Sequence, residues 1–212
     1  MTHPEAEALR ALIRSDPHAK WWAERTENTV KQDIWASVPQ TGFVPDNITD
    51  SFKRQAALDM CCGIGRNQAE LIYQFNTVLA YDLYGMLALM PPDIQLAYEF
   101  VTDDFKWLLD RIKTDYCVHT VYASIAFQHI HPEILEIYFK HLCEEIPQHR
   151  LMLKTRWYSD HKDNTGKPYK VSDLLAEWYD TDYLDVQIDG KQEGEFHYSA
   201  ILLPRVIEQR NK

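Results

Sequence analysis

The sequence predicts an α/β protein whose core is a mostly parallel β-sheet covered by helices on both faces. From residue 55 onward, short apolar runs such as AALDM, TVLAYD and VHTVYAS alternate with amphipathic stretches such as RNQAELIYQF and PEILEIYFKHLCEEI. Strands of this length separated by helices are typical of βαβ units, which build parallel sheets. The 212 residues are enough to bury one sizeable core, so we expect one domain with a small appendage.

The appendage is expected at the N-terminus. Leu9, Leu12 and Ile13 recur at helical spacing in a segment that is otherwise polar. Proline and glycine residues then interrupt the helical spacing before the first predicted strand. We therefore expect an N-terminal helical cap over residues 1–50, followed by the α/β domain over residues 51–212.

The other elements follow from the remaining apolar runs. AYEFV and RLMLK are expected as further strands, and SDLLAEWYD as a helix after a longer irregular segment. YLDVQID and EFHYSAILLP alternate between apolar and polar residues around Asp189 and Gly190, which predicts an antiparallel hairpin. The sheet is thus expected to end in antiparallel strands.

Composition disfavours several classes of function. Lys and Arg total 22 against 32 Asp and Glu, a net charge of -10, so the broad positive field of a nucleic-acid-binding protein is absent. No apolar stretch approaches the ~20 residues that span a bilayer, and no secretory pattern opens the chain. The cysteines show neither a C-x-x-C pair nor a metal-site spacing, so we expect reduced thiols, no metal and a cytoplasmic location. They are Cys61, Cys62, Cys117 and Cys143.

Two features point to a nucleoside-containing cofactor. Gly63 and Gly65 lie where the first predicted strand turns into a helix, where backbone N–H groups are free to approach a ligand. Asp82 ends the next strand, a position from which a carboxylate can accept both hydroxyl groups of a ribose. Gln68 stands where a dinucleotide-binding turn has its third glycine, so a pyrophosphate-binding motif is not complete.

The segment LDMCCGIGRN resembles the first motif of class I S-adenosylmethionine-dependent methyltransferases, whose usual form is LDLGCGxGRN. VLAYDL, FVTDDF and VYASIAFQHI are similar, in order, to the second, third and fourth strand regions of that family. The resemblance implies a Rossmann-like fold with a seven-stranded, mostly parallel sheet, an antiparallel C-terminal strand, S-adenosylmethionine as cofactor, and methyl transfer.

The resemblance also implies a set of cofactor-binding residues. Within it, Asp82 binds the ribose, and Asp104 matches the adenine-binding acid better than its neighbour Asp103. Phe105 either stacks beside adenine or covers the sheet. Asp59 either binds the cofactor or accepts N–H bonds from the loop. The full set is Asp59, Cys61, Gly63, Gly65, Asp82, Leu83, Asp103, Asp104, Phe105 and Ser124.

Two departures from the family pattern concern the turn and the fourth strand. Cys61 occupies the place of the first glycine, from which we expect a backbone that does not need positive φ there. Thr120 stands where the fourth strand commonly has Asp. The cysteine leaves open an alternative function, that of a catalytically inactive S-adenosylmethionine-binding or scaffold protein.

His129 and His131 follow the fourth strand, where the acceptor lies in the resembled family. Either could serve as a general base, or could simply begin a helix. Arg156, past the fifth strand, could bind a carboxylate or phosphate or form a plain surface ion pair. Asp160, Asp163 and Asn164 could bind a divalent ion, but the ligand spacing of a calcium loop is missing and a solvated turn is expected.

These observations predict a methyltransferase that acts on a small molecule through an oxygen or nitrogen nucleophile. The acidic charge and the absence of appended binding modules favour this acceptor class. A protein or RNA methyltransferase would need a basic groove around Arg150, Lys154 and Arg156.

Overall fold

A seven-stranded sheet forms the centre of the computed structural model, which describes residues 1–18, 20–21, 24, 56–83, 87–124, 126–156, 158–163, 165–180 and 197–205. Its strand order is β3-β2-β1-β4-β5-β9-β8. The strands are β1 (Ala56–Met60), β2 (Thr77–Tyr81), β3 (Phe100–Thr102), β4 (Val118–Ser124), β5 (Arg150–Arg156), β8 (Tyr179–Asp180) and β9 (His197–Pro204).

The first five strands are parallel, while β9 runs antiparallel to both β5 and β8. This order and the reversed β9 confirm the predicted fold class. The chain moves outward from β1 to β3 and then returns to place β4 on the other side of β1. Such a reversal leaves a crevice at the carboxyl ends of the strands, where α/β proteins of this type bind ligands.

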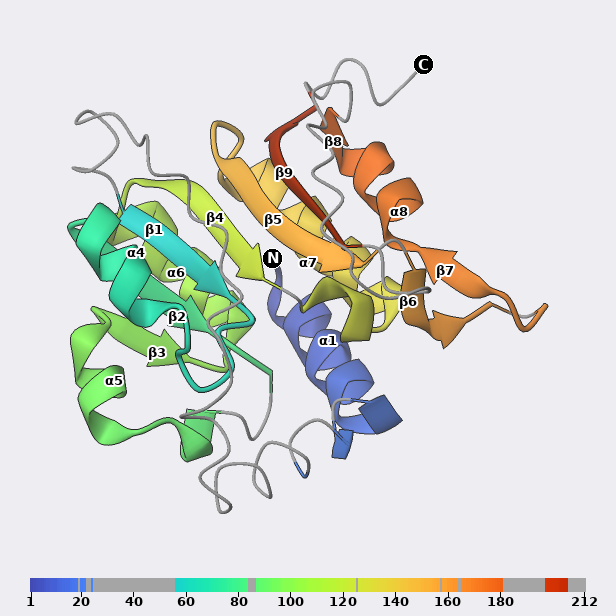
Figure 1. Cartoon of the computed structure of the whole chain (residues 1–212), viewed down its shortest axis with the longest axis horizontal. Coiled ribbons are helices and arrows are strands. Elements are labelled where there is room, and N and C mark those ends of the chain that lie inside the picture. Colours follow the sequence, from blue (N-terminus) through green and yellow to red (C-terminus); the bar gives the residue numbers. More distant parts are fainter. Residues whose placement is uncertain are drawn as a thin grey trace.

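Helices cover both faces of the sheet (Figure 1). Because successive side chains of a strand point to opposite faces, Leu58 and Met60 join one apolar core and Ala57 joins the other. The first core includes side chains of α1 (His3–Ser15), α6 (Phe105–Asp115), α7 (Pro132–Glu145) and α8 (Val171–Trp178). The second includes side chains of α4 (Gln68–Gln74) and the flanks of α5 (Pro92–Ala97).

Helix α1 lies beside the arrowheads of the parallel strands (Figure 1). It begins with a capping box in which Thr2 and Glu5 exchange hydrogen bonds, and it buries Leu9 and Ile13 in the first core. An ion pair of 2.5 Å joins Arg10 to Asp104 at the start of α6. The expected cap is therefore helical where α1 is described, whereas most of residues 22–50 lies outside the described residues, and the boundary at residue 50 stays a prediction.

Three elements differ from the sequence-based expectation. The run AYEFV was expected as a strand, but its first residue, Ala97, ends α5, and β3 begins only at Phe100. The helix was not predicted because Pro92 starts it and its apolar pattern is too short to recognise. The segment expected to be irregular after β5 contains a two-stranded hairpin, β6 (Tyr158–Lys162) and β7 (Pro168–Lys170). The first strand of the expected C-terminal hairpin, 183–189, lies outside the described residues.

Candidate active site

The loop between β1 and α4 contains three residues with left-handed backbone. Cys61, Gly63 and Gly65 have φ values of 61°, 59° and 82°. The expectation for Cys61 was therefore wrong: the turn keeps the conformation of a glycine although a side chain occupies it. The N–H of Cys62 donates to the Tyr81 carbonyl at 3.0 Å, which fixes the loop against β2 and imposes this conformation. A non-glycine residue adopts it at a cost of roughly 1–2 kcal/mol.

The two glycines of the loop serve different purposes. A Cβ atom on Gly65 would overlap the Cγ2 atom of Ile94, so this glycine lets α5 pack against the loop. A Cβ atom on Gly63 would meet no atom within 4 Å among the described residues. Gly63 therefore has open space beside it, and a ligand can approach its backbone there.

Asp82 ties this loop to the end of β2. Its Oδ2 accepts the N–H of Gly63 and its Oδ1 accepts the N–H of Leu83, both at 2.5 Å. The residue is only 5% exposed, and burial raises its pKa to about 7 although both hydrogen bonds act in the opposite direction. A carboxylate has about four lone-pair sites, so the donors among the described residues leave two of them unused.

Asp59, near the end of β1, lies beneath the loop. Its Oδ2 accepts the hydroxyl proton of Tyr98 at 2.7 Å, so the hydrogen bond seen for this carboxylate comes from the segment before β3 rather than from loop N–H groups. Burial raises the pKa of Asp59 to about 7, and the nearby charge of Asp82 adds to the shift. Two buried carboxyl groups therefore share one edge of the sheet.

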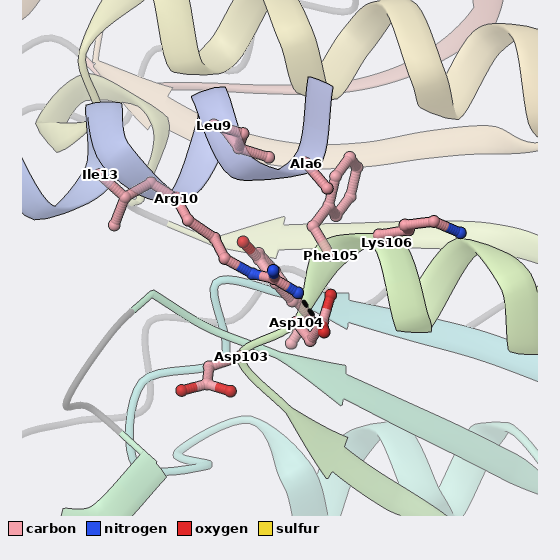
Figure 2. Close-up of a pocket in the computed structure, with 9 residues that line it drawn as sticks. Ala6, Leu9, Arg10, Ile13, Asp103, Asp104, Phe105 and Lys106 are labelled. Atoms are coloured by element: carbon pink, nitrogen blue, oxygen red, sulfur yellow. Dashed lines mark hydrogen bonds and ion pairs between the residues drawn. The ribbon is translucent and has the colours of Figure 1, made fainter. Parts of the chain in front are cut away.

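The residues after β3 have separate environments. Asp104 caps α6 by accepting the N–H of Trp107 at 3.0 Å, and it also binds Arg10. Asp103 is exposed and points away from that ion pair (Figure 2). Asp104 thus already has two partners, whereas Asp103 is accessible to a ligand.

Phe105 covers the sheet. Its ring centroid lies 4.6 Å from that of Tyr138 and 5.3 Å from that of Tyr81, and its side chain is buried. A small pocket opens beside it between α1 and the start of α6 (Figure 2). The pocket is lined by Ala6, Leu9, Arg10, Ile13, Tyr81, Asp103, Asp104, Phe105 and Lys106.

The predicted cofactor-binding residues thus lie at the carboxyl ends of β1, β2, β3 and β4, since Ser124 is the last residue of β4. Parallel neighbouring strands end at one edge, so these residues share it. Leu83 and Ser124 are half-buried there. Tyr98, the partner of Asp59, was not found from the sequence because no motif marks it.

A hydrogen-bonded network follows β4 and β5. The Nδ1 of His129 lies 2.5 Å from Asp160, whose other oxygen accepts an N–H of Arg156 at 2.8 Å. The Nε2 of His129 lies 3.1 Å from the amide nitrogen of Gln128, and the Thr155 hydroxyl donates to the amide oxygen of Gln128 at 2.7 Å. These partners assign the proton of the neutral ring to Nδ1 and the lone pair to Nε2.

Burial lowers the pKa of His129 to about 4, although Asp160 acts in the opposite direction. His131 begins α7 instead, where its Nδ1 accepts the N–H of Glu133 at 3.3 Å. The His161 ring lies beside His131 and His18, at centroid distances of 5.1 and 4.1 Å. Gln128 is adjacent to His129 in the chain, but its contact with Thr155 and the contact of His161 with His131 arise only from the tertiary fold, so no sequence spacing marks them.

Asp163 organises a turn by accepting N–H bonds from Thr165 and Lys167, as expected for a solvated turn, while Asn164 is outside the described residues. The expectation of a solvated turn was wrong for Asp160, which lies in β6 and binds His129 and Arg156 through tertiary contacts. No group of three or more His, Cys, Asp or Glu side chains suited to a metal ion occurs among the described residues. Within the same residues no helix is long and apolar enough to cross a bilayer.

Comparison with models of protein families and with curated proteins found no match. Similar solved structures include magnesium protoporphyrin IX methyltransferase from Synechocystis with bound S-adenosylmethionine, 16% identical over 85% of this chain and 77% of that chain, with a TM-score of 0.43. The glycopeptide N-methyltransferase MtfA, in complex with S-adenosylmethionine, is 13% identical over 83% of this chain and 94% of that chain, with a TM-score of 0.46.

A TehB-like S-adenosylmethionine-dependent methyltransferase from Corynebacterium glutamicum is 16% identical over 89% of this chain and 98% of that chain, with a TM-score of 0.43. At these identities the likeness is one of fold alone.

We expect Gly65→Ala to destabilise the protein more than Gly63→Ala. Both substitutions place a Cβ on left-handed backbone, at roughly 1–2 kcal/mol, but only the alanine at position 65 also overlaps Ile94, adding about 1–3 kcal/mol. Urea denaturation of both variants measures the difference. Equal losses of unfolding free energy would contradict the packing role of Gly65.

Asp59→Asn should flatten the pH dependence of stability. The wild-type pKa rises from 3.8 unfolded to about 7 folded, so the folded state binds more protons between these values and the free energy of unfolding falls as pH rises from about 4 to 7. Asparagine keeps an acceptor for Tyr98 but does not titrate. Denaturation midpoints at several pH values, with the exposed Asp110→Asn as control, test this. An unchanged slope would contradict it.

Proposed function

We propose that this protein transfers the methyl group of S-adenosylmethionine to a small-molecule acceptor through an oxygen or nitrogen nucleophile. One observation carries the proposal: the glycine loop and the buried carboxylate of Asp82 meet at the carboxyl ends of β1 and β2, beside the point where the strand order reverses. A ligand-binding crevice is expected at this place in such a sheet.

The residues at this edge fit the cofactor. The two unused lone-pair sites of Asp82 would accept the ribose hydroxyls, and the open space beside Gly63 would admit the part of the cofactor that adjoins the ribose. Asp103 would receive the adenine amino group more readily than Asp104, because Asp104 is already bound to Arg10 and to the start of α6. Leu83 and Ser124 would border the same space.

Cys61 would contact the amino-acid end of the cofactor. Its side chain is only half-buried in the turn, and burial together with the charge of Asp82 raises the pKa of its thiol. The thiol is therefore neutral at physiological pH and acts as a small apolar side chain. Retention of the glycine-like turn supports a binding-competent loop despite the cysteine.

The sulfonium of the bound cofactor supplies both the electrophilic methyl group and its leaving group. The protein must therefore align the acceptor and exclude water, whereas a base is optional. His129 is neutral at physiological pH, but its Nε2 lone pair accepts from Gln128, so it acts as a base only if an acceptor displaces that amide. Nδ1 of His131 caps α7. In this proposal, alignment of the acceptor with the methyl group is accordingly the main contribution to the rate acceleration.

A small acceptor is favoured over a protein or RNA. Arg150 lies at the opposite end of β5 from Arg156, roughly 20 Å away for a strand of this length. Arg150 also donates to Thr120 on β4. Of the three residues that would form a basic groove, Arg150 is therefore bound to β4 and lies apart from Arg156.

Asp82→Asn should weaken S-adenosylmethionine binding by roughly thirty- to a thousand-fold, the equivalent of about 2–4 kcal/mol, because two charge-assisted hydrogen bonds to the ribose are lost. Calorimetric titration measures the dissociation constant, and far-ultraviolet circular dichroism checks the fold. Asp110→Asn, which alters an exposed carboxylate on α6, is the matched control and should bind normally.

Unchanged affinity in Asp82→Asn would show that the ribose is not bound at this carboxylate. Production of S-adenosylhomocysteine from a panel of small nucleophiles then separates an active transferase from an inactive binding protein. Wild-type binding without turnover of any acceptor would favour the inactive alternative.

A further inference from the structure

The network after β4 and β5 includes an arginine, Arg156, with unused hydrogen-bond donors among the described residues. Gln128 and Thr155 are fully buried and bind each other, while His129 uses Nδ1 for Asp160 and Nε2 for Gln128. Both oxygens of Asp160 are also used, one for His129 and one for Arg156. Of the five side chains in this network, Arg156 is the one that keeps several donors for a ligand.

Arg156 is suited to bind an anion. A guanidinium has five N–H donors, and the hydrogen bond to Asp160 uses one of them. Nδ1 of His129 lies 3.5 Å from the same nitrogen, and it carries a proton of its own. Among the described residues, Nε and Nη1 of Arg156 have no partner, and the side chain is only 25% exposed. These donors can bind the oxygen atoms of a ligand.

The bond to Asp160 also restricts what can bind. It holds the guanidinium in place across the turn from β5 to β6, so fewer rotamers must be fixed when a ligand arrives. The adjacent negative charge of Asp160 repels a dianion more than a monoanion. A carboxylate, which matches two parallel guanidinium N–H groups, fits this environment better than a phosphate.

Arg156 is the last residue of β5, on the opposite side of β4 from the glycine loop. A molecule bound there lies over the half of the edge that the proposed cofactor does not use. Resting on the proposed function, we propose that the acceptor is a small carboxylic acid whose carboxylate is bound by Arg156. Because the guanidinium neutralises that carboxylate, the carboxylate binds the acceptor to the protein and is not itself methylated. The methyl group goes to another nucleophilic atom of the same molecule.

Binding of matched ligand pairs tests this inference without knowledge of the acceptor. Aromatic and aliphatic monocarboxylates, each with its primary amide, are titrated into protein saturated with S-adenosylhomocysteine, and the Nε–Hε resonance of Arg156 is followed by NMR. Carboxylates should shift this resonance, and amides should not. Arg156→Gln should weaken carboxylate binding at least tenfold, while Arg111→Gln, which alters a similarly paired arginine on α6, should not.

Equal binding of carboxylates and amides, absence of binding by any carboxylate, or unchanged binding in Arg156→Gln would overturn the inference. Tighter binding of phenyl phosphate than of benzoate would overturn the assignment of a carboxylate. Calorimetry with S-adenosylhomocysteine alone distinguishes the two proposals. If S-adenosylhomocysteine does not bind, the proposed function is contradicted. If it binds normally but no carboxylate binds, only this inference is contradicted.

Discussion

The hydrogen bond from the Gly63 N–H to the Asp82 carboxylate is the contact on which the rest of the site depends. It joins the glycine loop to the end of β2, and the neighbouring Cys62 N–H bond to Tyr81 repeats that connection along the backbone. The loop consequently keeps its left-handed turns even where a cysteine replaces glycine. The same carboxylate is buried and keeps two lone-pair sites, so one side chain shapes the loop and faces the space beside Gly63.

The reversal of strand order divides the functional edge into two halves with different chemistry. On the side of β1, β2 and β3, carboxylates and loop N–H groups fit the hydroxyls and amino group of a nucleoside. On the side of β4 and β5, neutral His129 and paired Arg156 leave N–H donors as the available polar groups. Helix α1 lies along this edge, where Arg10 binds Asp104 beside the small pocket.

Much of this arrangement follows from local sequence. The runs AALDM and VHTVYAS coincide with β1 and β4, because strands buried on both faces are continuously apolar and end at polar or turn residues. The conformation of Cys61 did not follow, since it is imposed by hydrogen bonds to β2 rather than by the residue itself. Contacts such as Tyr98 with Asp59, or His129 with Asp160, join residues far apart in the chain, and no spacing rule reveals them.

The central claim is that a nucleoside cofactor binds across the carboxyl ends of β1, β2 and β3. Amide hydrogen exchange with and without S-adenosylhomocysteine tests it most directly, because it reports where the ligand lies. We expect slower exchange in the loop 61–65, at Leu83 and at 103–105, with little change in the β6–β7 hairpin. Protection confined to other segments, or no protection at saturating ligand, would contradict it.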